Sequence, residues 1–67
     1  MLKTIQIIKW MTTQGFNQGE ILDEFQEIVN NERSVYFELT EFDIKQIREV
    51  YENEDRFDRA FKVSEII

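Results

Sequence analysis

Four closely spaced carboxylates are the side chains in this 67-residue sequence whose grouping is best suited to chemistry: Glu20, Asp23, Glu24 and Glu27. At three- and four-residue spacing they would share one face of a helix, and we call them the acidic ridge. Acid–base catalysis needs two carboxyls held in a cleft that raises the pKa of one of them. A calcium site needs oxygen ligands from alternate positions of a loop. The ridge fits neither pattern, so it predicts a docking surface for lysines and arginines or only a solvated helix face.

Other catalytic and metal-binding groups are missing from the composition. The sequence contains no histidine and no cysteine, which removes the usual ligands for zinc, iron and haem and the usual pairs of nucleophile and base. Gly15 and Gly19 lack the surrounding spacing, and the following Lys-Ser/Thr, of a phosphate-binding loop. We therefore expect no enzyme activity, no metal and no cofactor.

The charge balance limits the kind of partner. The formal net charge is −6, which argues against nucleic acid and anionic lipid as direct partners, because both are bound by basic patches. It favours another protein with a basic surface, for example a nucleic-acid-binding protein, since a row of carboxylates can imitate a phosphate backbone. The apolar runs at the start are interrupted by Lys3, Gln6 and Lys9 and are too short to span a membrane. We therefore expect a cytoplasmic protein. The general style of the sequence would suit a small regulator or inhibitor from a bacterium or its phage.

The ridge is expected to lie on a helix over residues 17–30. Asn17 and Glu20 have the spacing of a capping box, and apolar residues recur on the side away from the ridge. We expect this helix to be central, with the other helices packed on its apolar side. That side consists of Ile21, Leu22, Phe25, Ile28 and Val29.

A first helix is predicted from about residue 2 to 13. A strand over residues 4–8 is the competing interpretation, because that stretch is rich in isoleucine and threonine. Gly15 is expected to end the helix in the left-handed conformation. The apolar side of this helix is formed by Met1, Ile5, Ile8 and Met11, with Ile7 at its edge.

Trp10 is the second candidate for partner binding, because it projects away from that apolar side. Tryptophan is enriched among the residues that dominate binding energy at protein interfaces. The structural alternative is that another element of a small domain covers it. Tyr36 and Phe42 raise the same question, since each points away from its apolar neighbours.

Residues 34–39 alternate apolar and polar side chains in the manner of a strand. A lone strand needs a partner, so our main expectation is an extended connector that places Phe37 and Leu39 in the core. A lone or intermolecular strand remains open. Thr40, with Asp43, then caps a third helix, and a break near Asn53 starts a fourth. One long helix over residues 41–66 is the alternative, because no glycine or proline interrupts it.

The segment from residue 13 to residue 21 resembles the start of a helix-turn-helix unit, in which a glycine, an apolar residue and a capping residue precede a helix. That resemblance implies DNA binding. The chain departs from the pattern after the helix, because residues 32–40 look extended and the next helix begins with acids instead of a basic recognition surface.

The sequence as a whole predicts one all-α domain over residues 1–67, built as a small bundle of three to four short helices. The expected function is an acidic protein-interaction module that binds through the ridge, with Trp10 as an apolar anchor. A DNA-binding regulator and a purely structural or oligomerising protein, including a homodimer, are the alternatives.

Overall fold

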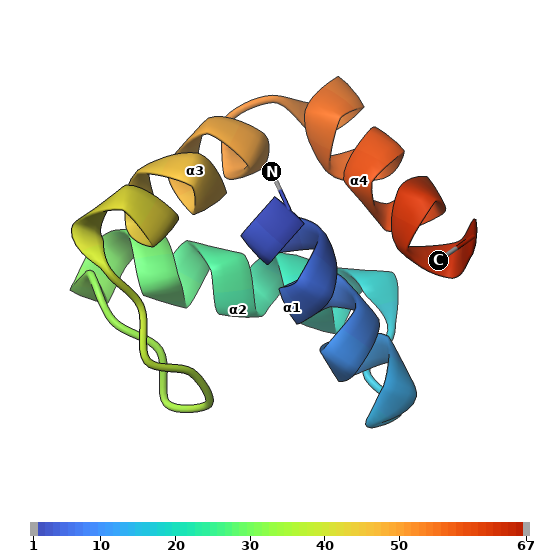
Figure 1. The fold of residues 1–67 in the computed structure, drawn as a ribbon, viewed down its shortest axis with the longest axis horizontal. Coiled ribbons are helices and arrows are strands. Elements are labelled where there is room, and N and C mark those ends of the chain that lie inside the picture. Colours follow the sequence, from blue (N-terminus) through green and yellow to red (C-terminus); the bar gives the residue numbers. More distant parts are fainter. Residues whose placement is uncertain (1, 67) are drawn as a thin grey trace.

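Four helices make up the fold (Figure 1), which a computed structural model describes for residues 2–66. They are α1 (Leu2–Thr13), α2 (Gln18–Asn31), α3 (Glu41–Tyr51) and α4 (Glu54–Ile66). No strand occurs between residues 2 and 66, so the predicted all-α bundle is confirmed. Met1, expected on the apolar side of the first helix, lies outside the described residues.

The turn between α1 and α2 follows the local signals in the sequence. Gly15 has φ +97°, and the backbone N–H groups of Gly15 and Phe16 donate to the carbonyls of Thr12 and Met11, both at 3.0 Å. This pattern is a Schellman ending, which requires a residue with positive φ. Asn17 Oδ1 then accepts from the Glu20 N–H at 2.9 Å, and Glu20 Oε1 accepts from the Asn17 N–H at 2.9 Å. The predicted capping box is therefore present.

The boundaries of the last two helices were also predicted correctly. Thr40 and Asp43 form a second capping box at the start of α3, with both hydrogen bonds at 3.1 Å. Asn53 separates α3 from α4, and its Oδ1 accepts from the Arg56 N–H at 3.2 Å. A single helix over residues 41–66 is thus excluded, because the chain leaves the helical path after Tyr51 and a new cap starts α4.

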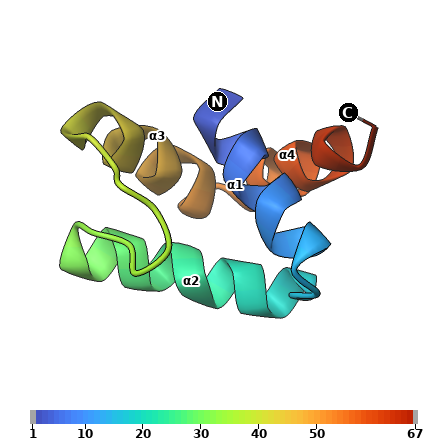
Figure 2. The same ribbon diagram turned by 60° about the horizontal axis from the view of Figure 1, so that its bottom comes forward.

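The helices form two layers rather than a ring around α2. Figure 2 shows α2 along one side, with α1, α3 and α4 lying across from it. Both α1 and α3 pack against every other helix, whereas α2 packs mainly against α1 and α3 and has little contact with α4. Our expectation of a central α2 was therefore wrong. All four helices still contribute buried side chains to one core, including Ile8, Phe25, Ile47 and Phe57.

Two apolar patterns differ from the expectation. Leu22 was expected in the core, yet 38% of its surface is exposed, because α4 leaves that side of α2 uncovered. On α1 the buried face includes Ile7 and Thr4, neither of which exposes more than 1%, while Ile5 is only partly buried. This face is displaced because α1 is covered by three helices.

The segment between α2 and α3 is a connector without strand structure. Phe37 and Leu39 are partly buried and pack against the core, as expected, while Val35 is 83% exposed. In Figure 1 this segment forms a loop that projects beyond α2, and its Tyr36 and Phe37 rings contact Trp10 of α1. The loop therefore places its side chains beside the first two helices.

Candidate interaction surface

The acidic ridge lies on the outer side of α2. Glu20, Asp23 and Glu27 are exposed, and Glu24 is half-buried. Glu20 is also part of the capping box, and Glu27 Oε2 accepts a hydrogen bond from Asn31 Nδ2 at 2.9 Å. None of the four carboxylates forms an ion pair with residues 2–66, so their negative charge is not neutralised by this part of the chain.

Glu24 connects the ridge to the loop between α2 and α3. Its Oε2 accepts a hydrogen bond from Ser34 Oγ at 3.3 Å, and Ser34 Oγ in turn accepts from the N–H groups of Tyr36 (3.1 Å) and Phe37 (3.3 Å). Burial raises the pKa of Glu24 above its ordinary value of 4.5; the Ser34 hydrogen bond opposes this rise, and the neighbouring Glu27 charge adds to it. Ser34 thereby fixes the loop against the ridge.

Four aromatic rings gather beside the ridge, and we call them the aromatic cluster: Trp10, Phe16, Tyr36 and Phe37. The Trp10 ring lies 5.2 Å from that of Phe37 and 5.8 Å from that of Tyr36, and Phe16 lies 5.9 Å from Tyr36 (centroid distances). Such separations are typical of attractive aromatic pairs. Trp10 remains 40% exposed and Tyr36 48% exposed, so the cluster is only partly covered.

The ridge and the aromatic cluster border the same hollow. A cavity of about 400 Å³ is lined by Phe16 and Tyr36 from the cluster and by all four ridge residues, with Met11 and Gln26. Tyr36 also contacts Trp10, so it joins the tryptophan to the acidic side of α2. The predicted residues thus belong to one continuous surface, with Trp10 at its border rather than inside the cavity.

The loop contributes more to this surface than the sequence predicts. The sequence indicates Tyr36 only as a weaker counterpart of Trp10, and it does not single out Phe16 or Ser34 as members of an interaction surface. A usable signal was present, because Tyr36 and Phe37 are adjacent aromatics in a segment without regular structure. Phe42, which the sequence groups with Tyr36, contributes to neither the cluster nor the cavity, and 68% of its surface is exposed.

Between residues 2 and 66 there is no group of three or more acidic, histidine or cysteine side chains placed to hold a metal ion. Over the same range no helix is long and apolar enough to cross a membrane.

Comparison with protein-family models, with curated proteins and with solved structures finds no match for this chain.

Proposed function

We propose that this protein is a small interaction module that docks on a basic surface of a partner protein. The observation that carries the proposal is the shared cavity: uncompensated carboxylates form one side of it, and partly exposed aromatic rings form the other. The carboxylates would attract lysine and arginine side chains and orient the encounter. The aromatic cluster would supply the apolar contact area on which affinity usually depends, with Trp10 and Tyr36 as its exposed members.

The test must keep Glu20 functional as a capping residue. Charge reversal at Glu20 would remove a cap contact, and the loss of a cap typically costs about 1 kcal/mol. The ridge variant therefore carries Gln at positions 20 and 24 and Lys at positions 23 and 27. Glutamine can still accept the capping hydrogen bond and the bond from Ser34.

A matched control changes the net charge by the same amount elsewhere. It carries Lys in place of Glu52, Asp55 and Glu65, which are exposed and do not line the cavity. Wild-type protein, the ridge variant and the control are used as bait in cell lysate, and captured proteins are identified by mass spectrometry. We expect wild type and control to capture the same partner, the ridge variant to lose it, and capture to weaken as salt rises. Equal capture by the ridge variant would refute the role of the ridge.

DNA binding is the alternative proposal, and it has less support. The basic side chains of α3 and α4 are interspersed with acids, and two of them are paired: Arg48 with Glu32 at 4.0 Å and Arg56 with Glu49 at 3.8 Å. A gel-shift titration at low salt tests it, because DNA complexes should form and then weaken as salt rises. A purely oligomeric role would instead require a sedimentation mass above that of one chain.

A further inference from the structure

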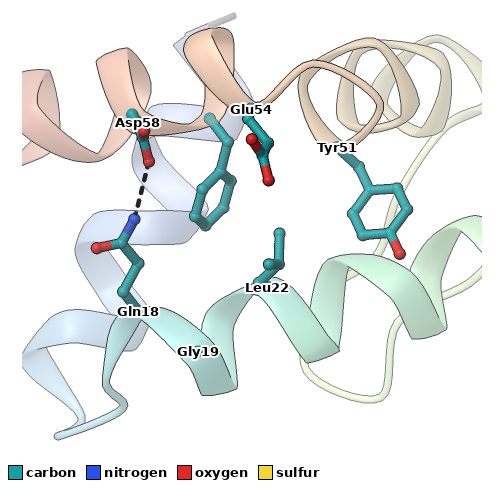
Figure 3. A pocket seen from close by; sticks show the side chains of 7 residues that line it. Gln18, Gly19, Leu22, Tyr51, Glu54 and Asp58 are labelled. Carbon is teal, nitrogen blue, oxygen red and sulfur yellow. Dashed lines mark hydrogen bonds between the residues drawn. The ribbon is translucent and has the colours of Figure 1, made fainter.

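A second hollow lies on the other edge of α2, where α2 faces α4 and the end of α3 (Figure 3). Its volume is about 500 Å³, within the range of ligand-binding clefts. Gln18 and Leu22 stand two residues before Glu20 and Glu24, so they point to nearly opposite sides of the helix. We call this hollow the α2–α4 groove; its lining residues are Gln18, Gly19, Leu22, Tyr51, Glu54, Phe57 and Asp58.

The floor of the groove is apolar. Phe57 exposes only 3% of its surface and packs edge-on against Phe25 of α2, with ring centroids 5.5 Å apart. Leu22 extends from α2 into the space below Glu54, as Figure 3 shows, and keeps 38% of its surface exposed. This exposure follows from the packing of α4 on α1 and α3, which leaves Leu22 without a covering helix.

The rim of the groove is acidic. Glu54 and Asp58 lie one turn apart on α4, and both side chains extend toward α2 in Figure 3. Asp58 Oδ1 accepts a hydrogen bond from Gln18 Nε2 at 3.0 Å, which closes one end of the groove. Neither carboxylate forms an ion pair with residues 2–66. A lysine or arginine side chain complements such a site, because its apolar stem can cover Leu22 while its charged end reaches a carboxylate.

We propose that the α2–α4 groove binds a basic amphipathic segment of a partner protein. An apolar side chain of that segment packs on Leu22 and Phe57, and a neighbouring lysine or arginine pairs with Glu54 and Asp58. A second copy of this chain is a poorer occupant, because it carries the same net charge of −6. Two of its most exposed apolar side chains, Phe42 and Ile66, also stand next to acidic residues. The groove is separate from the surface of the proposed function and does not depend on it.

The test uses a defined probe: an acetylated and amidated 12-residue helical peptide of Leu, Ala and Arg. Matched peptides carry Gln or Glu in place of Arg. Each is titrated into the full-length ¹⁵N-labelled ridge variant, in which the acidic ridge no longer competes for cations. We expect the Arg peptide to shift the amide signals of Gly19, Leu22, Tyr51 and Asp58 saturably. The Gln peptide should bind roughly tenfold more weakly at low salt, since it lacks the charge attraction, and the Glu peptide should not bind.

Two changes within the groove, made in the same background, separate its floor from its rim. Leu22→Gln should weaken binding of the Arg peptide by about threefold to tenfold, because less apolar surface is then buried. Glu54→Gln with Asp58→Asn should remove the preference for Arg over Gln, while the introduced amide oxygen still accepts the hydrogen bond from Gln18. Circular dichroism checks that helicity is kept, as expected for side chains at an exposed groove.

Unchanged affinity in both variants, equal binding of the Arg and Gln peptides, or shifts confined to other residues would overturn the proposal. A dimer that Leu22→Gln dissociates would assign the groove to a second copy and would also overturn it. Trp10 is the only tryptophan and lies on the other surface, so its fluorescence in wild-type protein reports on the ridge separately. A Trp10 response without groove shifts would reject the groove and leave the proposed function standing. Groove shifts without a Trp10 response would support the groove alone, and the capture experiment with the ridge variant then decides the proposed function.

Discussion

Thr4 is a buried residue whose replacement should stabilise the protein. It is fully buried in α1, and its Oγ1 has no hydrogen-bond partner among residues 2–66. By contrast, Thr12 and Thr13 of the same helix donate to the carbonyls of Ile8 and Lys9 at 2.8 and 2.9 Å. The Thr4 hydroxyl therefore loses its contact with water on folding and gains no hydrogen bond from residues 2–66.

The expected gain in the free energy of unfolding on replacing Thr4 comes from the hydroxyl group alone. An unsatisfied buried polar group costs about 1–3 kcal/mol. Valine has nearly the same shape as threonine and a similar helix propensity, so Thr4→Val should leave the packing and the helix almost unchanged. We expect the free energy of unfolding to rise by about 1–2 kcal/mol. For a domain of this size about 1 kcal/mol corresponds to roughly 4–8 °C in Tm.

Thermal and urea unfolding followed by circular dichroism measure this change. Thr4→Ser is the complementary variant: it keeps the hydroxyl, removes the buried methyl group and should destabilise the protein by about 1 kcal/mol. Thr13→Val is the control on an exposed position and should stay within about 0.5 kcal/mol of wild type. If Thr4→Val proves neutral or destabilising while Thr13→Val is neutral, the hydroxyl is satisfied and the reasoning is wrong.

Two further predictions concern the turn after α1 and the ridge. Gly15→Ala should destabilise the protein by about 1 kcal/mol or more, because φ at this position is +97°. Gly19→Ala inside α2 should be neutral or stabilising by up to about 1 kcal/mol. Urea unfolding measures both changes, and a change of the same sign in the two variants would contradict the turn geometry. Glu24→Gln tests the raised pKa of Glu24. The folded state holds the Glu24 proton more tightly than the unfolded state, so ionisation lowers the free energy of unfolding as pH rises through the folded pKa. This cost is absent below pH 4.5, the ordinary pKa of the group. The variant should therefore be more stable than wild type at pH 7, and urea titrations should show the gap closing by about pH 4; a gap independent of pH would refute the cause assigned to the shift.

The helix boundaries could be predicted because their signals are local. Asn17 with Glu20, Thr40 with Asp43, and Gly15 each determine hydrogen bonds or a φ angle within a few residues, and each was found as expected. The end of α2 shows where such signals are insufficient. The sequence predicts a helix that ends at residue 30, yet α2 extends to Asn31 and the left-handed residue is Glu32, with φ +56°. Its side chain also reaches Arg48 of α3 at 4.0 Å, a contact between helices that no local pattern shows.

The surfaces could be predicted only in part, because they depend on how far neighbouring elements extend. The ridge followed from spacing on one helix. Its association with Tyr36 and Phe37 depends on the loop folding back to place Ser34 against Glu24, ten residues away in the chain. A contact of that kind requires the three-dimensional path of the loop.

Leu22 and Trp10 show the same limit from the two edges of the fold. An apolar stripe on a helix indicates which side faces protein, but not whether a neighbour is long enough or close enough to cover its full width. On α2 the apolar stripe is wider than the surface that the neighbouring helices cover, so Leu22 stays exposed in the groove beside Glu54 and Asp58. On α1 Trp10 lies outside the stripe, yet the loop covers part of it with two aromatic rings. Leu22 lies beside the carboxylates of the groove, and Trp10 contacts Tyr36, which borders the hollow of the ridge. Places where a local rule fails are where function is expected. For that reason the two edges of α2, rather than its buried face, are where partner binding should be sought.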